Sequence, residues 1–297
     1  MFRQNSDNVH KVAPVFMVGL PRSGTTLLYQ LLLNHFHWSY FTRWSDCCYL
    51  TPVTAYRIQQ LIFPKPRYFE YESEYGKLKD QGYLSTVWRP VEGHRIWERW
   101  FPREPTHCYE SGLSAADREE MRATVAGFVK ISGNPFLNKN PRNSVRLIGL
   151  IEVFPNALVI VVKRQSLYVA QSLYIARMRR QSDGKNGNNR WWGTKPKEFI
   201  NLKNLDPLRQ AVGQTRAIER ELKTQLLSCA NRSIEVDYQD ICERPGEVLA
   251  EIQTLCTKNG IELQRTGDCK ATPFPIGNKR NVSESEFDSI AKLLNEF

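Results

Sequence analysis

The stretch VFMVGLPRSGTTLLYQLLLNH, residues 15–35, carries the clearest structural signal in this 297-residue chain. It begins with the apolar run 15–19, which is typical of a buried strand, and continues as a helix with leucines on one face. Gly19 and Gly24 bound the turn between them, where glycine permits backbone conformations that side chains block. Successive backbone N–H groups and the helix N-terminus can then converge on an anion. The sequence therefore predicts an anion-binding loop.

This loop differs from the phosphate-binding loop of nucleotide triphosphatases at its cation. Those enzymes carry Lys-Ser or Lys-Thr at the start of the helix. This chain has Thr25 and Thr26 there, and its cation is Arg22. A later apolar run ends in Lys163 and Arg164, where a triphosphatase would place an acidic magnesium ligand. We therefore expect a terminal phosphate that is bound without a metal.

Composition indicates an anionic partner. The formal net charge is +10 and the pI is about 9.3, which suits nucleic acid, an anionic membrane surface, or an anionic substrate and cofactor. Lys and Arg are dispersed along the chain apart from residues 177–180, so a nucleic-acid partner is disfavoured. Peripheral membrane contact stays open, and so does the oligomeric state.

Cysteine usage and hydropathy point to the cytoplasm. The seven cysteines show neither a CxxC pattern nor a Cys/His spacing, so we expect reduced thiols and no zinc site. The polar start of the chain does not resemble a signal peptide, and no apolar stretch approaches the length of a membrane span. The sequence predicts a cytoplasmic protein.

Strand-like and helical segments alternate along most of the chain, which predicts an α/β fold with a central, mostly parallel sheet flanked by helices in three layers. Residues 38–41, WSYF, suggest an additional strand. Asp206 and Pro207 are typical of a helix start, and Ser283 with Glu286 forms a capping-box pattern. We expect one domain over residues 1–297. Region 43–135, rich in Trp, Tyr, Pro and Arg, is interpreted as a substrate-facing elaboration.

The motif PRSGTT resembles the 5′-phosphosulfate loop of the sulfotransferases that use 3′-phosphoadenosine 5′-phosphosulfate (PAPS), in the arginine form of tyrosylprotein and many bacterial members. The resemblance implies a P-loop-like fold, PAPS as donor, 3′-phosphoadenosine 5′-phosphate (PAP) as product, and no metal. It also implies that the nucleotide is held by Arg22, Ser23, Gly24, Thr25 and Thr26.

A second landmark, VVKRQSLYVAQS, extends the resemblance. In the family, an Arg at a strand end and a Ser eight residues later bind the 3′-phosphate, which implies this role for Arg164 and Ser172. Tyr238 is similar to the family tyrosine that lies against the adenine, and an ordinary aromatic at a strand end is the alternative. Arg280 follows a Gly-Asn-Lys run where many members close a basic loop over the 3′-phosphate. A solvated charge beside a helix is the alternative for Arg280.

Catalytic candidates come from four segments, and the resemblance places Arg22 of the loop beside the bridging oxygen of the donor. The stretch FLNKNPRN resembles the Asn-Lys-Asp-Pro stretch of the tyrosylprotein enzymes, which implies that Lys139 touches the transferring group. A cation there would stabilise negative charge on the leaving oxygen, and a solvent-facing lysine is the alternative. Acceptor attack also requires a proton acceptor, and Asp46, Glu92 and His94 are the candidates. Salt bridges for the two acids, and a structural role for the histidine, are the alternatives.

The sequence therefore predicts a sulfotransferase that moves a sulfuryl group from PAPS to an acceptor hydroxyl or amine. We expect a carbohydrate, glycolipid or other small acceptor, because aromatic and basic side chains of the middle region can stack on sugars or hold acidic headgroups. The same aromatic residues are equally explained as core. A P-loop-type small-molecule kinase, which would require magnesium, is one alternative function. A basic nucleic-acid-binding protein is the other.

Overall fold

The computed structural model describes residues 12–65, 87–101, 112–182, 191–267 and 271–297. At the centre of these ranges lies a sheet of four parallel strands in the order β2-β1-β3-β4. The strands are β1 (Val15–Gly19), β2 (Leu137–Lys139), β3 (Leu158–Lys163) and β4 (Ser233–Asp237). The predicted parallel α/β architecture is confirmed.

The strand register explains why the opening stretch is continuously apolar. Val15 pairs with Leu137 on one side and with Leu158 on the other, so β1 is an internal strand. All five residues of β1 are buried, as expected for a parallel strand that is covered on both faces. β1 thus fixes the loop that follows it to the middle of the sheet.

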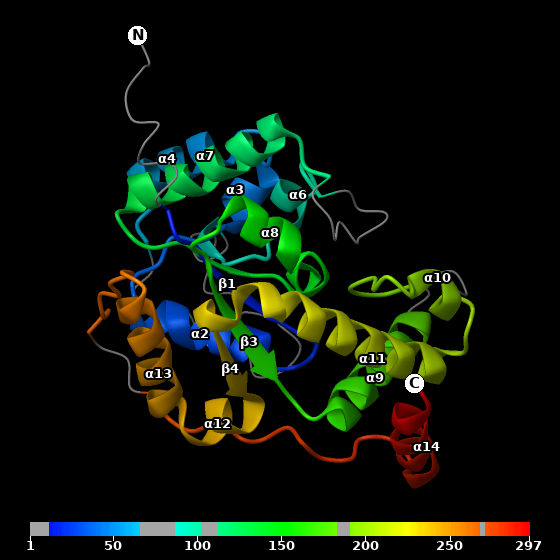
Figure 1. Ribbon diagram of the computed structural model, residues 1–297. Helices are drawn as coiled ribbons and strands as arrows, with labels where there is room; N and C mark the ends of the chain where they lie inside the picture. Colours follow the sequence, from blue (N-terminus) through cyan, green and yellow to red (C-terminus); the bar gives the residue numbers. More distant parts are fainter. Residues whose placement is uncertain (1–11, 66–86, 102–111, 183–190, 268–270) are drawn as a thin grey trace.

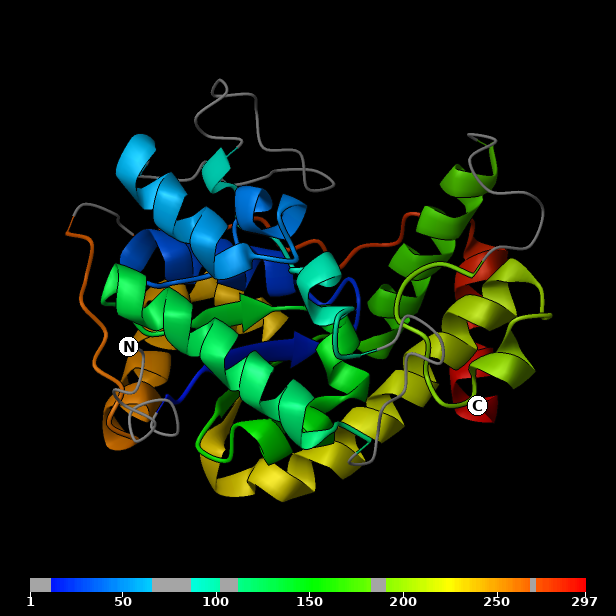
Figure 2. The ribbon, with the colours of Figure 1, turned by 90° about the horizontal axis from the view of Figure 1, so that it is seen from above.

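Helices cover both faces of the sheet (Figure 1). The long helix α11 passes in front of the strands in this view, whereas α2 lies behind them; Figure 2 shows the same two sides from above. The helices are α2 (Thr25–His35), α3 (Arg43–Cys47), α4 (Pro52–Ile62), α6 (His94–Trp97), α7 (Ala115–Ser132), α8 (Leu147–Val153), α9 (Ser166–Ser182), α10 (Phe199–Leu202), α11 (Pro207–Leu226), α12 (Tyr238–Glu243), α13 (Pro245–Lys258) and α14 (Glu284–Glu296). Two 3₁₀ segments complete them, η1 (Pro141–Val145) and η2 (Leu227–Arg232).

Two predicted helix starts are confirmed in atomic detail. The Asp206 side chain accepts hydrogen bonds from the backbone N–H groups of Leu208 and Arg209 at 3.1 and 3.0 Å, which caps α11. Ser283 and Glu286 form the reciprocal capping box of α14. No helix in the described ranges combines the length and the hydropathy that crossing a bilayer requires.

The expected strand at residues 38–41 is wrong. Ser39 forms one isolated parallel bridge with Phe136, and no ladder extends from it. The reason is the next residue, Thr42, whose side chain accepts a hydrogen bond from Ser45 N–H at 3.2 Å and begins helix α3. The capping box therefore ends the extended segment before a strand can form.

The aromatic residues of the middle region are part of the main hydrophobic core. Trp88, Trp97 and Phe101 are fully buried, in the same cluster as β1. Trp97 makes an edge contact with Phe16 of β1, with ring centroids 6.1 Å apart. Of the two explanations left open for these rings, the structure favours core packing over contact with a sugar.

Candidate active site

The carboxyl ends of the four described strands gather most of the predicted site residues at one edge of the sheet. In Figure 2 the blue arrow of β1 and the green arrow of β3 point the same way. The anion-binding loop follows β1, Lys139 ends β2, Arg164 follows β3 and Tyr238 follows β4. Ligands of open α/β sheets bind at this edge.

The loop after β1 has an unusual backbone. Gly24, the residue before α2, is left-handed with φ 99°, and Arg22 has φ 73°. Arg22 is the one non-glycine residue with a positive φ in the described part of the chain. Such a conformation is unfavourable for a side-chain-bearing residue and is typical of functional sites. The loop therefore keeps this backbone conformation at a conformational cost.

Ser23 leaves an unused hydroxyl inside this loop. Its side chain is fully buried, and its Oγ has no hydrogen-bond partner among the described residues. Ser144 of η1 fixes the other end of the loop, because its Oγ accepts from Gly19 N–H at 3.0 Å and donates to the Gly19 carbonyl at 2.8 Å. Buried hydroxyl groups rarely lack a partner, so Ser23 is prepared for a ligand. Sequence reasoning missed Ser144, whose role depends on tertiary contacts.

Arg164 joins the loop to the C-terminal part of the chain. Its guanidinium donates to the Arg22 carbonyl at 2.9 Å, the Gly277 carbonyl at 2.9 Å and the Asn278 side-chain oxygen at 2.8 Å. Burial lowers the pKa of Arg164, and no carboxylate in the described ranges pairs with it. Gly277 and Asn278 were not predicted, since their approach to Arg164 spans more than a hundred residues of sequence.

Two predicted ligands, Arg22 and Ser172, contact each other directly. Arg22 Nε donates to Ser172 Oγ at 3.0 Å, which links the loop to helix α9. Both members of the predicted 3′-phosphate pair bond Arg22: Arg164 donates to its backbone carbonyl, and Ser172 accepts from its side chain.

Tyr238 packs against the glycine of the loop. A Cβ atom at Gly24 would lie 2.4 Å from Tyr238 Cδ2, so no larger residue fits there without movement. The Tyr238 hydroxyl accepts from Gly277 N–H at 3.1 Å, and the Arg164 guanidinium stacks 4.4 Å from the ring centroid. Tyr238 is therefore part of the loop's support as well as a predicted adenine contact.

Arg280 lies apart from this group of contacts. Its guanidinium forms an ion pair at 3.4 Å with Glu284, the first residue of α14, and about half of its side chain is exposed. This is the arrangement expected of a charge flanking a helix. The neighbouring backbone is nevertheless held to α9, because Gln171 bonds Lys279 O at 3.0 Å and Asn281 N–H at 2.9 Å.

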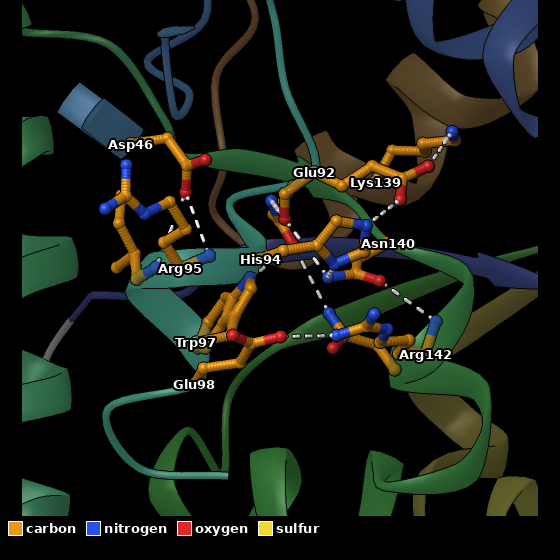
Figure 3. A network of polar contacts seen from close by, with 12 residues as sticks. Asp46, Glu92, His94, Arg95, Trp97, Glu98, Lys139, Asn140 and Arg142 are labelled. Carbon is orange, nitrogen blue, oxygen red and sulfur yellow. Dashed lines mark hydrogen bonds and ion pairs between the residues drawn. The ribbon is translucent and has the colours of Figure 1, made fainter. Parts of the chain in front are cut away.

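Lys139, Glu92 and His94 form one charged cluster (Figure 3). The Lys139 ammonium group donates to Glu92 Oε1, and His94 Nε2 lies 2.7 Å from Glu92 Oε2. Asn140 holds the segment in place by donating to the Glu92 carbonyl at 3.1 Å. Lys139 is only 7% exposed, so the alternative of a solvent-facing lysine does not describe its position.

The protonation state of Glu92 follows from these neighbours. Burial alone would raise its pKa, but the charges of Lys139 and His94 and their hydrogen bonds lower the pKa from 4.5 to about 2. Glu92 is therefore a carboxylate throughout the neutral range. A carboxylate with so low a pKa is a weak proton acceptor and a strong partner for cations.

Asp46 has a structural position. Its Oδ1 accepts hydrogen bonds from the backbone N–H groups of Arg95 and Ile96 at 3.1 and 3.4 Å, so it caps the short helix α6 from a distant segment. Burial raises the pKa of Asp46, and these backbone bonds partly oppose that shift. Figure 3 shows Asp46 beside Arg95, on the far side of His94 from Lys139.

Tyr29 is a polar residue of the site that sequence reasoning missed. It lies on α2, it is 4% exposed, and its hydroxyl has no hydrogen-bond partner among the described residues. Burial raises its pKa, and the charge of Glu92 raises it further, so the phenol stays protonated. The helical leucine pattern around Tyr29 hid this residue, because an aromatic side chain on such a face normally indicates packing alone.

No group of three or more His, Cys, Asp or Glu side chains that could hold a metal ion occurs in the ranges that the structure describes. The charged side chains of the candidate site include the cations Arg22, Lys139 and Arg164 and the carboxylate of Glu92.

The sequence matches the model of the sulfotransferase family over residues 14–264. The chain belongs to that family. Membership favours sulfuryl transfer over the kinase and nucleic-acid alternatives. Among proteins with curated descriptions, none matches this sequence significantly.

Solved structures agree with the family assignment at the level of the fold. Sulfotransferase STF9 from Mycobacterium avium superposes with a TM-score of 0.55 and 15% identity, over 96% of this chain and 68% of that one. Sulfotransferase STF1 from Mycobacterium tuberculosis H37Rv gives a TM-score of 0.55 and 13% identity, over 98% of this chain and 78% of that one. The sulfotransferase therefore has the predicted P-loop-like fold, and identities this low show nothing finer.

Proposed function

We propose that this sulfotransferase transfers a sulfuryl group from PAPS to an acceptor hydroxyl or amine and releases PAP, without a metal. The observation that carries the proposal is the buried, unpartnered Ser23 hydroxyl in a loop at the carboxyl edge of the sheet. It is an open hydrogen-bond donor between a helix N-terminus and two arginines, Arg22 and Arg164. Such a set of donors suits phosphate oxygens.

The other residues of the loop fit the same donor. In PAPS the sulfuryl group is bonded through an oxygen to the 5′-phosphate, and the nucleotide carries a second phosphate at the 3′ position. Ser23, Thr25, Thr26 and the N–H groups near Gly24 would hold the 5′-phosphate. Arg164 and Ser172 would hold the 3′-phosphate, Tyr238 would lie against the base, and Arg280 would approach from the C-terminal segment. Arg164 is not neutralised by a described carboxylate, which leaves its charge for this anion.

Lys139 and Arg22 would stabilise the charge that grows on the leaving oxygen. Lys139 ends β2 and Arg22 lies in the loop after the neighbouring strand β1, and the two strands pair through Met17 and Lys139. Preorganised cations at a leaving group commonly contribute a large part of catalysis. Glu92 holds Lys139 in position until the donor's negative charge competes for the ammonium group.

The proton acceptor that the geometry favours is His94. Glu92 is a weak base because of its low pKa, and Asp46 is occupied as the cap of α6. His94 lies beside Glu92, which can orient the imidazole and stabilise its charged form after proton uptake. Carboxylate–histidine pairs act in this way in many enzymes. We therefore assign His94 as the base, Glu92 as its positioning residue and Asp46 to structure.

The acceptor class is a sugar or a glycolipid. The aromatic rings of the middle region are buried, so they do not support a sugar acceptor. The support comes from polar groups: Asn140, His94 and the Arg142–Glu98 pair lie together at the strand ends. On helix α4, Ile58, Leu61 and Ile62 are 42%, 81% and 62% exposed, which suits contact with a membrane that carries a glycolipid. Region 43–135 supplies helix α4, His94 and Glu98, and its free Cys47 and Cys48 fit a cytoplasmic enzyme.

Calorimetry with PAP and ATP, each with magnesium and with a chelator, tests the donor. We expect PAP to bind more tightly than ATP and to bind equally well after chelation. Equal affinity for the two nucleotides, or loss of PAP binding on chelation, contradicts the proposal. Mass spectrometry of glycans and glycolipids incubated with PAPS then identifies the acceptor by the mass of an added sulfuryl group.

A further inference from the structure

Arg177 is a buried cation that the proposed reaction does not use. It lies on α9 and is 5% exposed. Its Nη2 donates to Gln214 Oε1 of α11 at 2.9 Å. Its Nε and Nη1 are buried and have no hydrogen-bond partner in the described ranges. The guanidinium therefore has unused donors on two of its three nitrogens.

No described carboxylate forms an ion pair with Arg177. Burial lowers the pKa of Arg177 to about 10, so the guanidinium still carries its charge at neutral pH. The Trp191 ring centroid lies 5.1 Å from it, and a ring face attracts a cation without using its N–H groups. A buried ion without an anion is unfavourable, and buried donors nearly always have a partner. The unpaired charge and the unused N–H groups therefore both indicate that Arg177 binds an anion from outside the described chain.

The surroundings of Arg177 form a built site. Gln214 is fully buried, and its Nε2 donates to the carbonyls of Trp192 at 3.1 Å and Thr194 at 2.6 Å. Trp191 Nε1 donates to the Thr194 carbonyl at 3.2 Å, which fixes the ring beside the guanidinium. Helix α9, helix α11 and segment 191–194 thus hold Arg177 in one position.

The site adjoins the proposed donor site. Leu173, one helical turn before Arg177, packs in a cluster with Leu20 of the anion-binding loop, and Trp192 lies against that cluster. Ser172, the neighbour of Leu173, contacts Arg22. One turn of helix advances about 5.4 Å, so an anion at Arg177 would lie within the span of a small acceptor from the loop.

We propose that Arg177 binds an oxyanion, a carboxylate or sulfate group carried by the acceptor. The unused Nε and Nη1 lie on either side of Nη2, and each can donate to an oxygen of such a group. Gln214 holds Nη2 in place, and the Trp191 ring lies against the guanidinium. The inference rests on the proposed function and specifies its substrate as an acidic acceptor.

The first experiment measures inorganic sulfate binding by calorimetry in the presence of saturating PAP, which fills the proposed nucleotide site. We expect Arg177→Gln to weaken sulfate binding by about tenfold or more, because charged hydrogen bonds are lost. Arg180→Gln is the matched control. Arg180 lies on the same helix, and its guanidinium is 5.2 Å from the centroid of the neighbouring Trp192 ring. Its substitution by Gln removes the same charge. Sulfate binding that is absent in the wild type, or equal in Arg177→Gln, overturns the proposal.

If Arg177→Gln does not fold, two other measurements decide. Arg177→Lys keeps the charge but loses the fork, and it should also weaken sulfate binding. Sulfate should change the tryptophan fluorescence of the wild type but not of Trp191→Phe, whose ring is no longer a reporter beside Arg177. A sulfate response that is unchanged in both variants overturns the proposal.

A second arm separates an acceptor group from a free anion. Binding of 4-nitrophenyl glucuronide and of the neutral 4-nitrophenyl glucoside is measured with PAP present. We expect the glucuronide to bind more tightly than sulfate, with dependence on Arg177, and the glucoside to show no such dependence. A glucuronide that binds no better than sulfate assigns the site to free anions and overturns its role in acceptor binding. Failure of PAP itself to bind contradicts the proposed function instead, and the sulfate titration without nucleotide still tests Arg177.

Discussion

Two charged regions lie at the same edge of the sheet and are neutralised differently. Around the anion-binding loop, Arg164 bonds only carbonyl and amide oxygens, and the Ser23 hydroxyl bonds nothing in the described chain. In the second region, Lys139 and His94 share one carboxylate, Glu92. We propose that the first region binds an external anion. The second is internally balanced, so a ligand must compete with Glu92 before Lys139 can act on it.

The largest expected effect is on turnover when the second region loses its cation. Lys139→Met should reduce kcat by about 100-fold to about 1,000-fold, because a preorganised charge near the leaving oxygen is removed. PAP affinity should change little, since the loop remains intact. Steady-state kinetics and calorimetry on the same preparation make the comparison. A kcat within a few-fold of the wild type would mean that Lys139 has a structural role. The second region would then not contribute to catalysis through this cation.

The next effect concerns the first region and should have the opposite pattern. Arg164→Gln should weaken PAP binding by about 1.5–3 kcal/mol, the usual value for hydrogen bonds to a charged group. Its effect on kcat at saturating donor should be smaller than that of Lys139→Met. Lys163→Gln is a matched control, because Lys163 is adjacent, exposed and paired with Glu235 at 2.9 Å. Equal losses in both variants would mean that net charge, rather than a specific site, attracts the nucleotide.

The contrast between the regions also explains what the sequence could predict. The loop is local, since its glycines, hydroxyl groups and cation lie within one strand–turn–helix unit. Its position at the carboxyl edge followed from the alternation of strands and helices. Arg164 and Tyr238 were named through the resemblance to the family, and each directly follows a strand.

The second region could not be assembled from spacing alone. Glu92 and Lys139 lie 47 residues apart, and neither has a pattern that indicates the other. The sequence named both residues, together with His94, but did not rank Glu92 against His94 and Asp46, because the rank depends on which charges surround each acid. The buried rings of the middle region show the same limit, since composition alone does not distinguish a ligand surface from a core.

Glu92→Gln tests the internal balance of the second region through stability. Because the pKa of Glu92 is lowered in the folded protein, its contribution is fully present above pH 4.5 and is lost as the pH falls toward about 2. At neutral pH the variant should lose about 1–3 kcal/mol, since the buried Lys139 keeps its charge without a partner. Urea unfolding of both proteins from pH 3 to pH 7 should show curves that converge on the acidic side. A difference in unfolding free energy that stays constant from pH 3 to pH 7 would mean that Lys139 and His94 do not lower the pKa of Glu92.

The smallest effect is expected for Asp46, which borders the second region without joining its charges. Asp46→Ala removes the acceptor of the Arg95 and Ile96 backbone N–H groups, and loss of such a cap costs about 1 kcal/mol of folding stability. Asp46→Asn keeps a side-chain oxygen at that position, so its stability should lie between the wild type and Asp46→Ala. Turnover in both variants should remain near the wild-type value, because His94 still has Glu92 beside it. Thermal unfolding and kinetics measure the two effects separately. If Asp46→Asn abolishes turnover while the protein stays as stable as the wild type, Asp46 and not His94 accepts the proton. Asp46 would then belong to the catalytic cluster with Lys139 and Glu92.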